Sequence, residues 1–484
     1  MEKNMNRMYI NGEWMESASK ETIKVINPSN LETLYFIPRG CQEDVDLAVK
    51  AARDAFESHE WQQVKPYERG VLLYNVAQAI RNEKEAIAEM ETLDCGKPIS
   101  QAKADVEAAA RYFEYYAGVA DKVLGETIPI EPGILDYTVR EPVGVTAHII
   151  PWNYPLQVLS RSTAAAIATW NAVVVKPAED TPATALKLAA IFDETNLPKG
   201  IFNVVTGYGH EAGAALSDHP NINHMTFTGS VETGMAVMTA ASRHVTPVTL
   251  ELGGKSPNIV FEDCNQDEAL DWVTRSIIQN AGQTCSAGAR LLVQSTIHEE
   301  FVGKICERMN ALVIGPGITD PDIGPILSEK QINRIESFID LAKIENVDIL
   351  VGGERAYISD SDQGYYFKPT VLDNVDPLSK LSQEEIFGPV LTVYSFDNEE
   401  EALKLANGTQ YGLVAGIWTK DIGRAHRLAD KINAGQIFIN NYGAGGGIQM
   451  PFGGYKKSGF GREKSLEALR NYTQVKNIAV KTYL

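Results

Sequence analysis

Short runs of alternating apolar and polar residues occupy the chain from Met8 to about Arg39, where glycine and proline interrupt them, and this pattern predicts strands and turns. The next stretches repeat apolar residues at the three- and four-residue spacing of amphipathic helices. We expect these helices over 43–58, 66–96 and 100–123. Alternation returns over 128–140, which indicates an edge ribbon.

Between 144 and 261, apolar runs rich in β-branched residues alternate with helical stretches at 160–170, 182–195 and 231–242. This alternation predicts βαβ units, a parallel sheet and a doubly wound nucleotide-binding domain. A second series begins at Asp267 with an amphipathic helix that stops at Gly282, continues with a strand over 291–293 and alternates further to Asn440. We therefore expect a second α/β domain.

Composition narrows the class of protein. The chain has 484 residues, 44% hydrophobic and 22% charged, which is typical of a soluble chain of two or three domains. Its 63 acidic against 44 basic residues give a net charge of −19, which argues against a nucleic-acid partner. The most apolar stretch, 163–175, is shorter than the roughly 20 residues that a membrane span needs, so we expect no membrane partner.

The amino terminus lacks the apolar centre of a secretory signal, and the five cysteines are scattered without a C-x-x-C pair. Neither a disulfide framework nor a zinc site is expected from such cysteines. The eight histidines form no H-x-x-x-H pair, so no metal site is predicted. A cytoplasmic location follows as the expectation.

Two side chains with chemical potential lie beside glycines. Cys285, in GQTCSAGAR, follows the helix stop at Gly282, where a thiol can lie near backbone N–H donors, although a single cysteine is more often a small buried apolar residue. Glu251 ends the run VTLE, and ligands of open α/β sheets collect at the carboxyl ends of strands. Without further evidence, a glutamate satisfied by nearby backbone N–H groups is the simpler interpretation.

Asn153 stands in the turn PWNYP, where two prolines restrict the backbone. Its amide could donate to an oxyanion, or it could merely cap its own turn. Lys176 and Glu179 follow a buried strand and could meet ribose hydroxyls. Glycines in TGYGHEAG (207–213) and FTGSVETG (227–234) precede helices, which suits phosphate, but neither run is the G-x-G-x-x-G fingerprint.

Seven segments of the sequence, taken together, favour the functional interpretations of these residues over the structural ones. PWNYP, KPAEDTP, FTGS, LELGGKSPNIVF, GQTCSAG, EEIFGPV and PFGGYKKSGFGRE occur in an order and spacing that closely resemble the NAD(P)-dependent aldehyde dehydrogenase superfamily. The resemblance runs from about Tyr9 to Lys481, and it points to the hydrolytic, non-acylating type.

The resemblance implies catalytic roles for residues of this chain. Cys285 would be the nucleophile, Glu251 the general base, and the Asn153 side chain with the Cys285 N–H the oxyanion hole. Such a site forms a thiohemiacetal, passes hydride to nicotinamide and hydrolyses the resulting thioester. Glu463 of the GRE motif is retained as a further catalytic residue.

The resemblance also implies NAD as cofactor. Lys176 and Glu179 would hold the adenosine ribose, and the Glu179 charge would disfavour the 2′-phosphate of NADP. The complete expected cofactor set is Ile149, Pro151, Trp152, Lys176, Glu179, Gly209, Gly213, Phe227, Gly229, Ser230, Leu252, Gly253, Glu385 and Phe387.

Three structural parts are implied as well: a Rossmann-like NAD-binding domain (1–123 and 143–253), an α/β catalytic domain (254–457), and a β-ribbon oligomerisation element (124–142 and 458–484). In relatives such a ribbon builds dimers or tetramers, so we expect a homodimer or homotetramer.

Two departures from the family stand out. Many relatives carry Lys where this chain has Ser162, which puts a proton relay with Glu463 in doubt. Trp170 stands where relatives commonly have Gly, and the sequence offers no physical account of it.

Substrate choice is expected to depend on Arg161, at helical spacing from Tyr154 and Val158. A guanidinium suits aromatic or carboxylate-bearing aldehydes and disfavours betaine aldehyde. Gln279 replaces an arginine of succinate-semialdehyde relatives, and the glycine-rich loop 442–447 should widen the tunnel mouth, so an aromatic or broad range is preferred. The alternative is that Arg161 pairs with a surface carboxylate. The expected substrate set is Tyr154, Val158, Arg161, Thr284, Ser286 and Phe452.

Three other functions compete with hydrolytic oxidation: a semialdehyde dehydrogenase for a carboxylate-bearing aldehyde, an acylating aldehyde dehydrogenase, and a non-catalytic scaffold. Acylating members that use coenzyme A characteristically lack the glutamate, so Glu251 weighs against them. Retention of Cys285, Glu251 and Asn153 together weighs against the scaffold.

Overall fold

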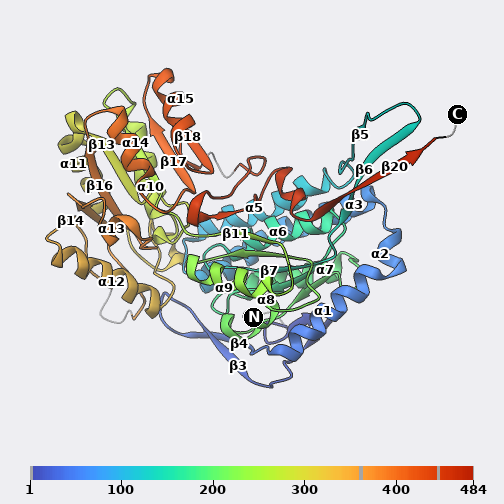
Figure 1. Ribbon diagram of the computed structural model, residues 1–484. Helices are drawn as coiled ribbons and strands as arrows, with labels where there is room; N and C mark the ends of the chain where they lie inside the picture. The colour runs from blue at the N-terminus through green and yellow to red at the C-terminus, as the bar shows by residue number, and fades with distance from the viewer. Residues whose placement is uncertain (1–3, 359–362, 444–446, 483–484) are drawn as a thin grey trace.

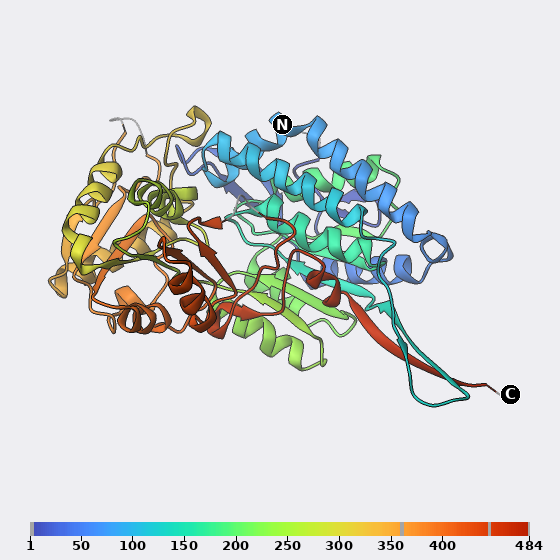
Figure 2. The ribbon, with the colours of Figure 1, turned by 90° about the horizontal axis from the view of Figure 1, so that it is seen from above.

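The computed structural model describes residues 4–358, 363–443 and 447–482, and it shows two α/β lobes and a projecting ribbon (Figures 1 and 2). The predicted fold class is confirmed: both lobes are built on largely parallel sheets.

The first lobe contains a sheet of eight strands in the order β19-β11-β10-β7-β8-β9-β1-β2, counted over the described residues. The strands from β11 to β9 are parallel, and β19, β1 and β2 pair antiparallel at the two edges. The bounds in chain order are β1 (Met8–Ile10), β2 (Glu13–Met15), β7 (Val145–Ile149), β8 (Ala172–Lys176), β9 (Phe202–Val204), β10 (His224–Thr228), β11 (Val248–Glu251) and β19 (Gly459–Phe460).

Helices cover both faces of this sheet (Figure 1). On one face lie α6 (Pro155–Ala168) and α7 (Ala183–Glu194), with α3 (Pro66–Asn82), α4 (Lys84–Cys95) and α5 (Ile99–Ala117) packed outside them. On the other face lie α1 (Gln42–Glu57), α8 (Ala214–Ser217) and α9 (Val231–Ser242), and α2 (His59–Gln63) follows α1. The burial of β7 and β8 on both faces explains why their sequences are continuous β-branched and apolar runs.

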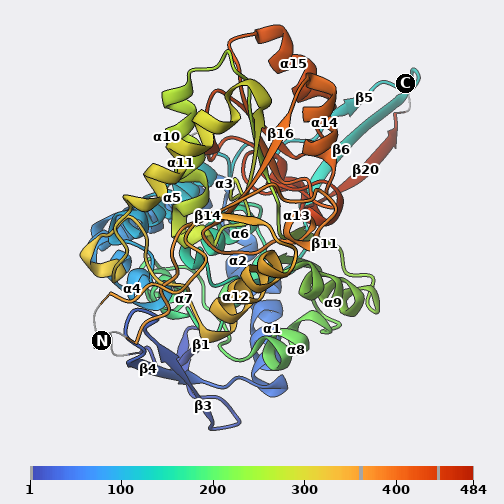
Figure 3. The same cartoon turned by 90° about the vertical axis from the view of Figure 1, so that its left-hand side faces the viewer.

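The second lobe contains a sheet of seven strands in the order β14-β15-β16-β13-β12-β17-β18, again within the described residues. Its strands are β12 (Pro257–Val260), β13 (Arg290–Gln294), β14 (Asp348–Val351), β15 (Thr370–Asp373), β16 (Val390–Phe396), β17 (Val414–Trp418) and β18 (Gln436–Ile439). One core joins α10 (Gln266–Ile278) and α11 (His298–Asn310) to one face; another joins α12 (Glu329–Ile344), α14 (Glu399–Asn407) and α15 (Ile422–Lys431) to the opposite face (Figure 3). The short helix α13 (Lys380–Gln383) precedes β16.

The ribbon consists of β5 (Thr127–Ile128), β6 (Ile134–Pro142) and β20 (Thr473–Lys481), and it extends away from both lobes (Figure 2). Strand β20 pairs antiparallel with β6 from Thr473 opposite Pro142 to Lys481 opposite Ile134. Tyr472 anchors the start of β20, because its fully buried hydroxyl bonds Thr226 of β10. A separate hairpin joins β3 (Thr22–Ile26) to β4 (Thr33–Pro38).

Three expectations differ from the structure. The helix expected over 66–96 is divided at Glu83, whose φ of −106° and ψ of 17° are not helical. The helix expected from 160 begins at Pro155, because proline fits the first helical position after the PWNYP turn. Within 458–484, all assigned to the ribbon, β19 instead pairs with β11 in the first sheet. The domain boundaries themselves stay a prediction.

Candidate active site

Three predicted site residues lie at the carboxyl ends of neighbouring strands of the first sheet. Asn153 follows β7, Lys176 ends β8, and Glu251 ends β11, with Thr228 at the end of β10 between them. Parallel strands bring these ends to one edge of the sheet, where ligands of open α/β folds bind. The edge faces residues that the second lobe supplies.

The two glycines after Glu251 allow this close approach. A Cβ at Gly253 would lie 2.3 Å from a carboxylate oxygen of Glu385, and one at Gly254 would lie 2.4 Å from the carbonyl oxygen of Cys285. Neither glycine has a positive φ, so space explains them, not an unusual backbone conformation. The segment after β11, residues 252–254, is called the strap below. It passes directly against the loop that carries Cys285, the cysteine loop.

The loop before Cys285 is held in an uncommon conformation. Asn280, Ala281 and Gly282 all have left-handed φ angles, of 49°, 54° and 74°. Asn280 donates its side-chain amide to the Asn153 carbonyl at 3.0 Å, and the Asn153 amide donates to the Gln283 carbonyl at 3.0 Å. This reciprocal pair fixes Asn153 beside the loop that carries Cys285.

Asn153 is buried and its amide has a second N–H, besides the one that bonds Gln283. The backbone N–H of Cys285 makes no hydrogen bond with any residue that the structure describes. Two donors with spare capacity next to a thiol are the arrangement that stabilises an oxyanion.

The Cys285 thiol is half-buried. Burial raises its pKa to about 12, the nearby Arg161 opposes this, and the carboxyl groups of Glu385 and Glu251 add to it. In this state the sulfur is a protonated thiol at neutral pH. Attack on an electrophile therefore needs a group that accepts its proton.

Glu251 is 1% exposed, and neither of its carboxylate oxygens has a hydrogen-bond partner among the described residues. Burial raises its pKa well above the usual range, Arg161 lowers it, and Glu463 raises it further. A raised pKa makes the ionised carboxylate a stronger base than that of an exposed glutamate, which suits a general base.

Arg161 and Glu463 form a buried ion pair between α6 and the segment after β19. Nη2 of Arg161 donates to the Thr228 hydroxyl at 3.4 Å. The guanidinium carbon of Arg161 lies 5.2 Å from the centre of the Phe452 ring. The alternative of a surface carboxylate as the partner of Arg161 is therefore wrong, because Glu463 is buried. The role of Arg161 toward the substrate stays a prediction. Phe452 and Glu463 exchange backbone hydrogen bonds at 2.7 Å, which holds this cluster together.

Ser162 lies on another side of α6. Its hydroxyl meets Nδ1 of His148 at 3.0 Å, and Nε2 of that ring meets Thr146 at 2.9 Å. Burial lowers the pKa of His148 to about 3, so the ring is neutral. Ser162 thus serves the contact between helix and sheet, and Arg161 supplies the cation that Glu463 requires.

The other predicted substrate residues surround the cysteine loop. Tyr154 and Val158 are buried at the start of α6, and Lys97 lies 4.3 Å from the centre of the Tyr154 ring. The hydroxyls of Thr284 and Ser286 are 3.5 Å apart, and Tyr442 donates to the Ser286 carbonyl at 2.8 Å. Of the expected wide loop 442–447, residues 444–446 lie outside the described residues.

The expected adenosine site contains a charged pair. Lys176 donates to Glu179 at 2.9 Å, and a Cβ at Gly213 would lie 3.8 Å from the Lys176 side chain. Burial raises the pKa of Glu179, but attraction to Lys176 and hydrogen bonds bring it below the usual value. The carboxylate is therefore charged. Gly209 and Gly213 bound a short π-helical turn that leads into α8.

The expected pyrophosphate site is the start of α9. Ser230 caps this helix by accepting from the Thr233 N–H at 3.2 Å, and a Cβ at Gly229 would lie 2.6 Å from the Phe227 ring. A Cβ at Gly234 would meet Leu252 at 2.5 Å, so the first turn of α9 packs on the strap. A helix amino terminus suits a phosphate group.

The expected nicotinamide site joins both lobes. Phe387 has a left-handed φ of 65°, and its ring lies 5.2 Å from the Trp152 ring in an edge-on arrangement. Glu385 accepts from the Gly254 N–H at 2.9 Å. Pro151 and Ile149 precede Trp152 at the end of β7. A cavity of about 10 Å³, large enough for about one water molecule, lies between Glu385, Gly254 and Thr284.

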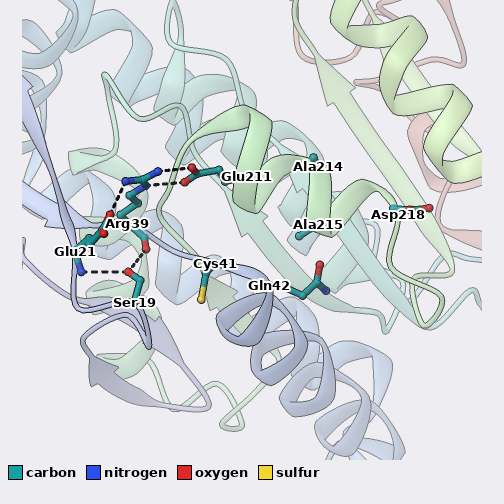
Figure 4. Close-up of a pocket in the computed structure, with 9 residues that line it drawn as sticks. All are labelled: Ser19, Glu21, Arg39, Cys41, Gln42, Glu211, Ala214, Ala215 and Asp218. Atoms are coloured by element: carbon teal, nitrogen blue, oxygen red, sulfur yellow. Dashed lines mark hydrogen bonds and ion pairs between the residues drawn. The ribbon is translucent and has the colours of Figure 1, made fainter.

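Another pocket lies away from these residues (Figure 4). It measures about 570 Å³ and is open to solvent between the β3–β4 hairpin, the start of α1 and α8. Arg39 in this pocket pairs with Glu21 and Glu211. Its lining contains none of the predicted site residues.

The described part of the chain contains no group of three or more His, Cys, Asp or Glu residues arranged to hold a metal ion. Over the same residues, no helix has the length and apolar character needed to cross a membrane. All five cysteines are free thiols.

Sequence reasoning missed several supporting residues: Asn280, Gln283, Tyr442, Lys97 and Lys464. Asn280 and Gln283 flank Cys285 closely enough to have been suspected. The Lys464 ammonium lies 5.0 Å from the centre of the Phe452 ring, and its charge directly after Glu463 of the GRE motif was the available signal.

The aldehyde dehydrogenase family model matches residues 14–478. An aldehyde dehydrogenase of Emericella nidulans is 43% identical over 473 residues, which cover 97% of this chain and 94% of the relative. A betaine aldehyde dehydrogenase of Bacillus subtilis is 41% identical over 475 residues, covering 97% and 96%. The NAD+ complex of an aldehyde dehydrogenase from Bacillus cereus has a TM-score of 0.96 and 42% identity, covering 98% of this chain and 96% of that one.

Proposed function

Because this chain belongs to the aldehyde dehydrogenase family and is an NAD-dependent aldehyde dehydrogenase, we propose that it oxidises an aldehyde to the acid through a thioester on Cys285. One observation carries this mechanism: the buried carboxyl of Glu251, which has no hydrogen-bond partner among the described residues, is close enough to Cys285 to raise the pKa of its thiol. The Asn153 amide binds the loop that carries this thiol.

Each residue of the site has its own step in the proposed mechanism. A water molecule beside the thiol carries the proton of Cys285 to solvent, and the sulfur attacks the aldehyde carbon. The Asn153 amide and the Cys285 N–H stabilise the alkoxide of the thiohemiacetal. Bound NAD supplies the acceptor for the hydride that the carbon loses. Glu251 then deprotonates a water molecule, which attacks the thioester and releases the carboxylate and the free thiol.

The proposed cofactor site uses the residues placed above. Lys176 and Glu179 would take the ribose hydroxyls, the start of α9 the pyrophosphate, and Glu385 with Phe387 the nicotinamide riboside. Their fit is supported by the glycines whose missing side chains open the path between them. A charged Glu179 favours NAD over NADP, because the 2′-phosphate would meet a like charge.

The alternatives are weaker on the same evidence. Transfer of the acyl group to coenzyme A or phosphate needs no base for water, yet Glu251 is kept and its pKa is raised. A non-catalytic scaffold would not need the reciprocal bonds that hold Asn153 at the cysteine loop.

An aromatic or broad range of aldehydes remains our proposal for the substrate. The betaine aldehyde relative is named for a cationic substrate, which the Arg161 and Lys464 charges near Phe452 oppose here.

We further propose a cytoplasmic enzyme that assembles into homodimers or homotetramers through the ribbon. The five free thiols support a reducing compartment. The exposed edge strand β20 supports association.

The test of the mechanism is Cys285→Ala beside Cys306→Ala, a half-buried cysteine of α11. Cys285→Ala should lose NADH formation from propanal and benzaldehyde while binding NAD with unchanged affinity, and Cys306→Ala should keep both. Oxidation by Cys285→Ala within tenfold of wild type would overturn the proposed nucleophile.

A further inference from the structure

Cys285 lies in a tight turn of the backbone. The Ala287 N–H donates to the Thr284 carbonyl at 3.1 Å, so Cys285 and Ser286 are the two central residues of a β-turn. A β-turn uses the N–H of its fourth residue and leaves the N–H of its second residue free. The turn therefore explains why the Cys285 N–H is available for an oxyanion.

The chain on either side of this turn is fixed by other hydrogen bonds. Before the turn, the Gln283 carbonyl accepts from the Asn153 amide at 3.0 Å, and the Gln283 side chain accepts from the Leu327 N–H at 2.9 Å. After the turn, the Gly288 N–H donates to the carbonyl of Ser276 in α10 at 3.0 Å. These bonds fix where the turn begins and ends, but they do not reach its two central residues.

A tyrosine from a distant part of the second lobe binds the turn directly. The Tyr442 hydroxyl donates to the Ser286 carbonyl at 2.8 Å, although the two residues are 156 positions apart in the sequence. Burial raises the pKa of Tyr442, and interaction with Cys285 adds to this shift. The hydroxyl therefore keeps its proton and can donate at any pH at which the enzyme works.

The ring of Tyr442 is held firmly as well. Tyr442 follows β18 and is 6% exposed, and its ring centre lies 5.9 Å from that of Phe438. A Cβ at Gly416 of β17 would lie 3.0 Å from Cδ2 of the Tyr442 ring, so the absence of a side chain at Gly416 leaves room for the ring. A side chain locked by packing in this way can hold a catalytic group in a precise position.

We propose that Tyr442 is a positioning residue of the oxyanion hole, whose hydroxyl holds the turn so that the Cys285 N–H points at the oxygen of the attacked aldehyde. This inference rests on the proposed function and deepens it, because it assigns the group that orients one of the two proposed donors. Tyr442 acts through the Ser286 carbonyl and needs no contact with the aldehyde.

Two reactions of the same thiol distinguish the direction of this N–H from the position of the sulfur. Attack on an aldehyde carbonyl places negative charge on the oxygen, which the N–H stabilises. Attack on iodoacetamide forms a sulfur–carbon bond, releases iodide, gives the thiol proton to water and produces no oxyanion. A residue that orients the N–H should therefore affect aldehyde oxidation more than alkylation.

The test is Tyr442→Phe, which removes the hydroxyl and keeps the ring beside Gly416. NADH formation from benzaldehyde should slow about tenfold in single-turnover experiments with enzyme in excess and NAD saturating, because the oxyanion loses a well-directed donor. The rate of Cys285 alkylation by iodoacetamide, followed by the mass of the peptide that contains it, should change less than twofold. The affinity for NAD should also stay within twofold of wild type.

Tyr366→Phe is the matched control. Tyr366 is also buried in the second lobe and also donates to a backbone carbonyl, that of Ser29, at 2.9 Å. Removing its hydroxyl should lower the melting temperature as much as Tyr442→Phe does, yet leave both reaction rates within twofold of wild type.

A second variant keeps the Tyr442 hydroxyl and displaces its ring. Gly416→Ala places a Cβ 3.0 Å from that ring and 2.6 Å from Oδ1 of Asn258, so both side chains must shift. This variant should also slow oxidation more than alkylation, and it tests the same support if Tyr442→Phe does not fold.

Oxidation by Tyr442→Phe within twofold of the wild-type rate, or an equal fall in oxidation and alkylation in either variant, would overturn the role of Tyr442. Absence of NADH formation by the wild type with any aldehyde would instead contradict the proposed function.

Discussion

Two buried carboxyl groups, Glu251 and Glu463, lie near one guanidinium, that of Arg161. The ion pair goes to Glu463, while Glu251 keeps both oxygens without a partner among the described residues. This choice matters chemically, because a carboxylate paired with arginine loses its basicity and an unpaired buried one gains it. We interpret the Arg161–Glu463 pair as a positioning unit that leaves Glu251 available for proton transfer.

Removing one member of this pair should be costly. Glu463→Gln leaves the Arg161 charge buried without its partner, and we expect about 3 kcal/mol less free energy of unfolding in urea. Glu467→Gln, which removes a partly exposed ion pair with Arg470, should change stability by less than about 1 kcal/mol. Similar small losses in both variants would show that the buried pair contributes little.

Cofactor choice is a second property of single residues. Glu179→Gln removes the negative charge expected to face a 2′-phosphate, so kcat/KM with NADP should rise about tenfold while the value with NAD changes less. The exposed Glu194 at the end of α7 provides a control, and Glu194→Gln should leave both values unchanged. Equal use of NADP and NAD by the wild type would contradict the assignment of Glu179.

Single residues also show how far sequence reasoning reaches. Cys285, Glu251 and Asn153 could be selected because each belongs to a local motif at a strand end or loop. The partner of Arg161 could not, since Glu463 is 302 positions away and only the tertiary fold brings the two together. The left-handed backbone at Lys464 could not be predicted either, because lysine, unlike glycine or asparagine, does not indicate a positive φ in a sequence.

At the scale of elements, the contacts at the end of α6 explain how Trp170 is accommodated where relatives commonly have Gly. Trp170 follows the helix in a left-handed conformation, with φ of 77°, where glycine is favoured. Its indole donates to the Trp61 carbonyl at 3.0 Å, Trp61 donates back to the Trp170 carbonyl at 2.9 Å, and the Arg69 guanidinium lies 4.0 Å from the Trp170 ring centre. These contacts offset the strained backbone and tie α6 to α2 and α3.

This compensation can be measured with two variants. Trp170→Gly relieves the strain but loses the indole contacts, so we expect about 1–3 kcal/mol less stability in thermal or urea unfolding. Trp170→Ala loses the contacts and keeps the strain, so it should be about 1 kcal/mol worse than Trp170→Gly. A glycine variant more stable than wild type would mean that the contacts do not offset the strain.

Most helices and strands could be predicted from periodicity, because each buries an apolar face in the core of its own lobe. The break at Glu83 between α3 and α4 could not, since apolar residues continue at helical spacing across it. The pairing of β19 could not be predicted either. Its two residues pair with β11 only because the carboxy-terminal segment crosses back over the first lobe.

At the scale of the whole molecule, the ribbon extends away from both lobes (Figure 2). Strand β20 forms the edge of the three-stranded sheet, and Leu135 and Val480, opposite each other on β6 and β20, are 49% and 41% exposed. An edge strand with exposed apolar neighbours is a site for pairing with another copy.

We therefore expect a dimer or tetramer by light scattering, and a smaller species for the double variant Leu135→Asp/Val480→Asp. Leu378→Asp, at an 84% exposed site of the second lobe, should leave the assembly unchanged. A monomeric wild type, or a double variant of unchanged mass, would contradict association through the ribbon.

The central claim is that Glu251 activates the water that hydrolyses a thioester on Cys285, and pre-steady-state NADH formation by Glu251→Gln tests it most directly. In stopped-flow experiments with saturating NAD and benzaldehyde, the variant should release about one NADH per active site in a burst. A steady state at least a hundredfold slower than that of wild type should follow, because deacylation limits turnover. Equal loss of the burst and of the steady-state rate would contradict the account, since Glu251 would then be needed before the thioester forms.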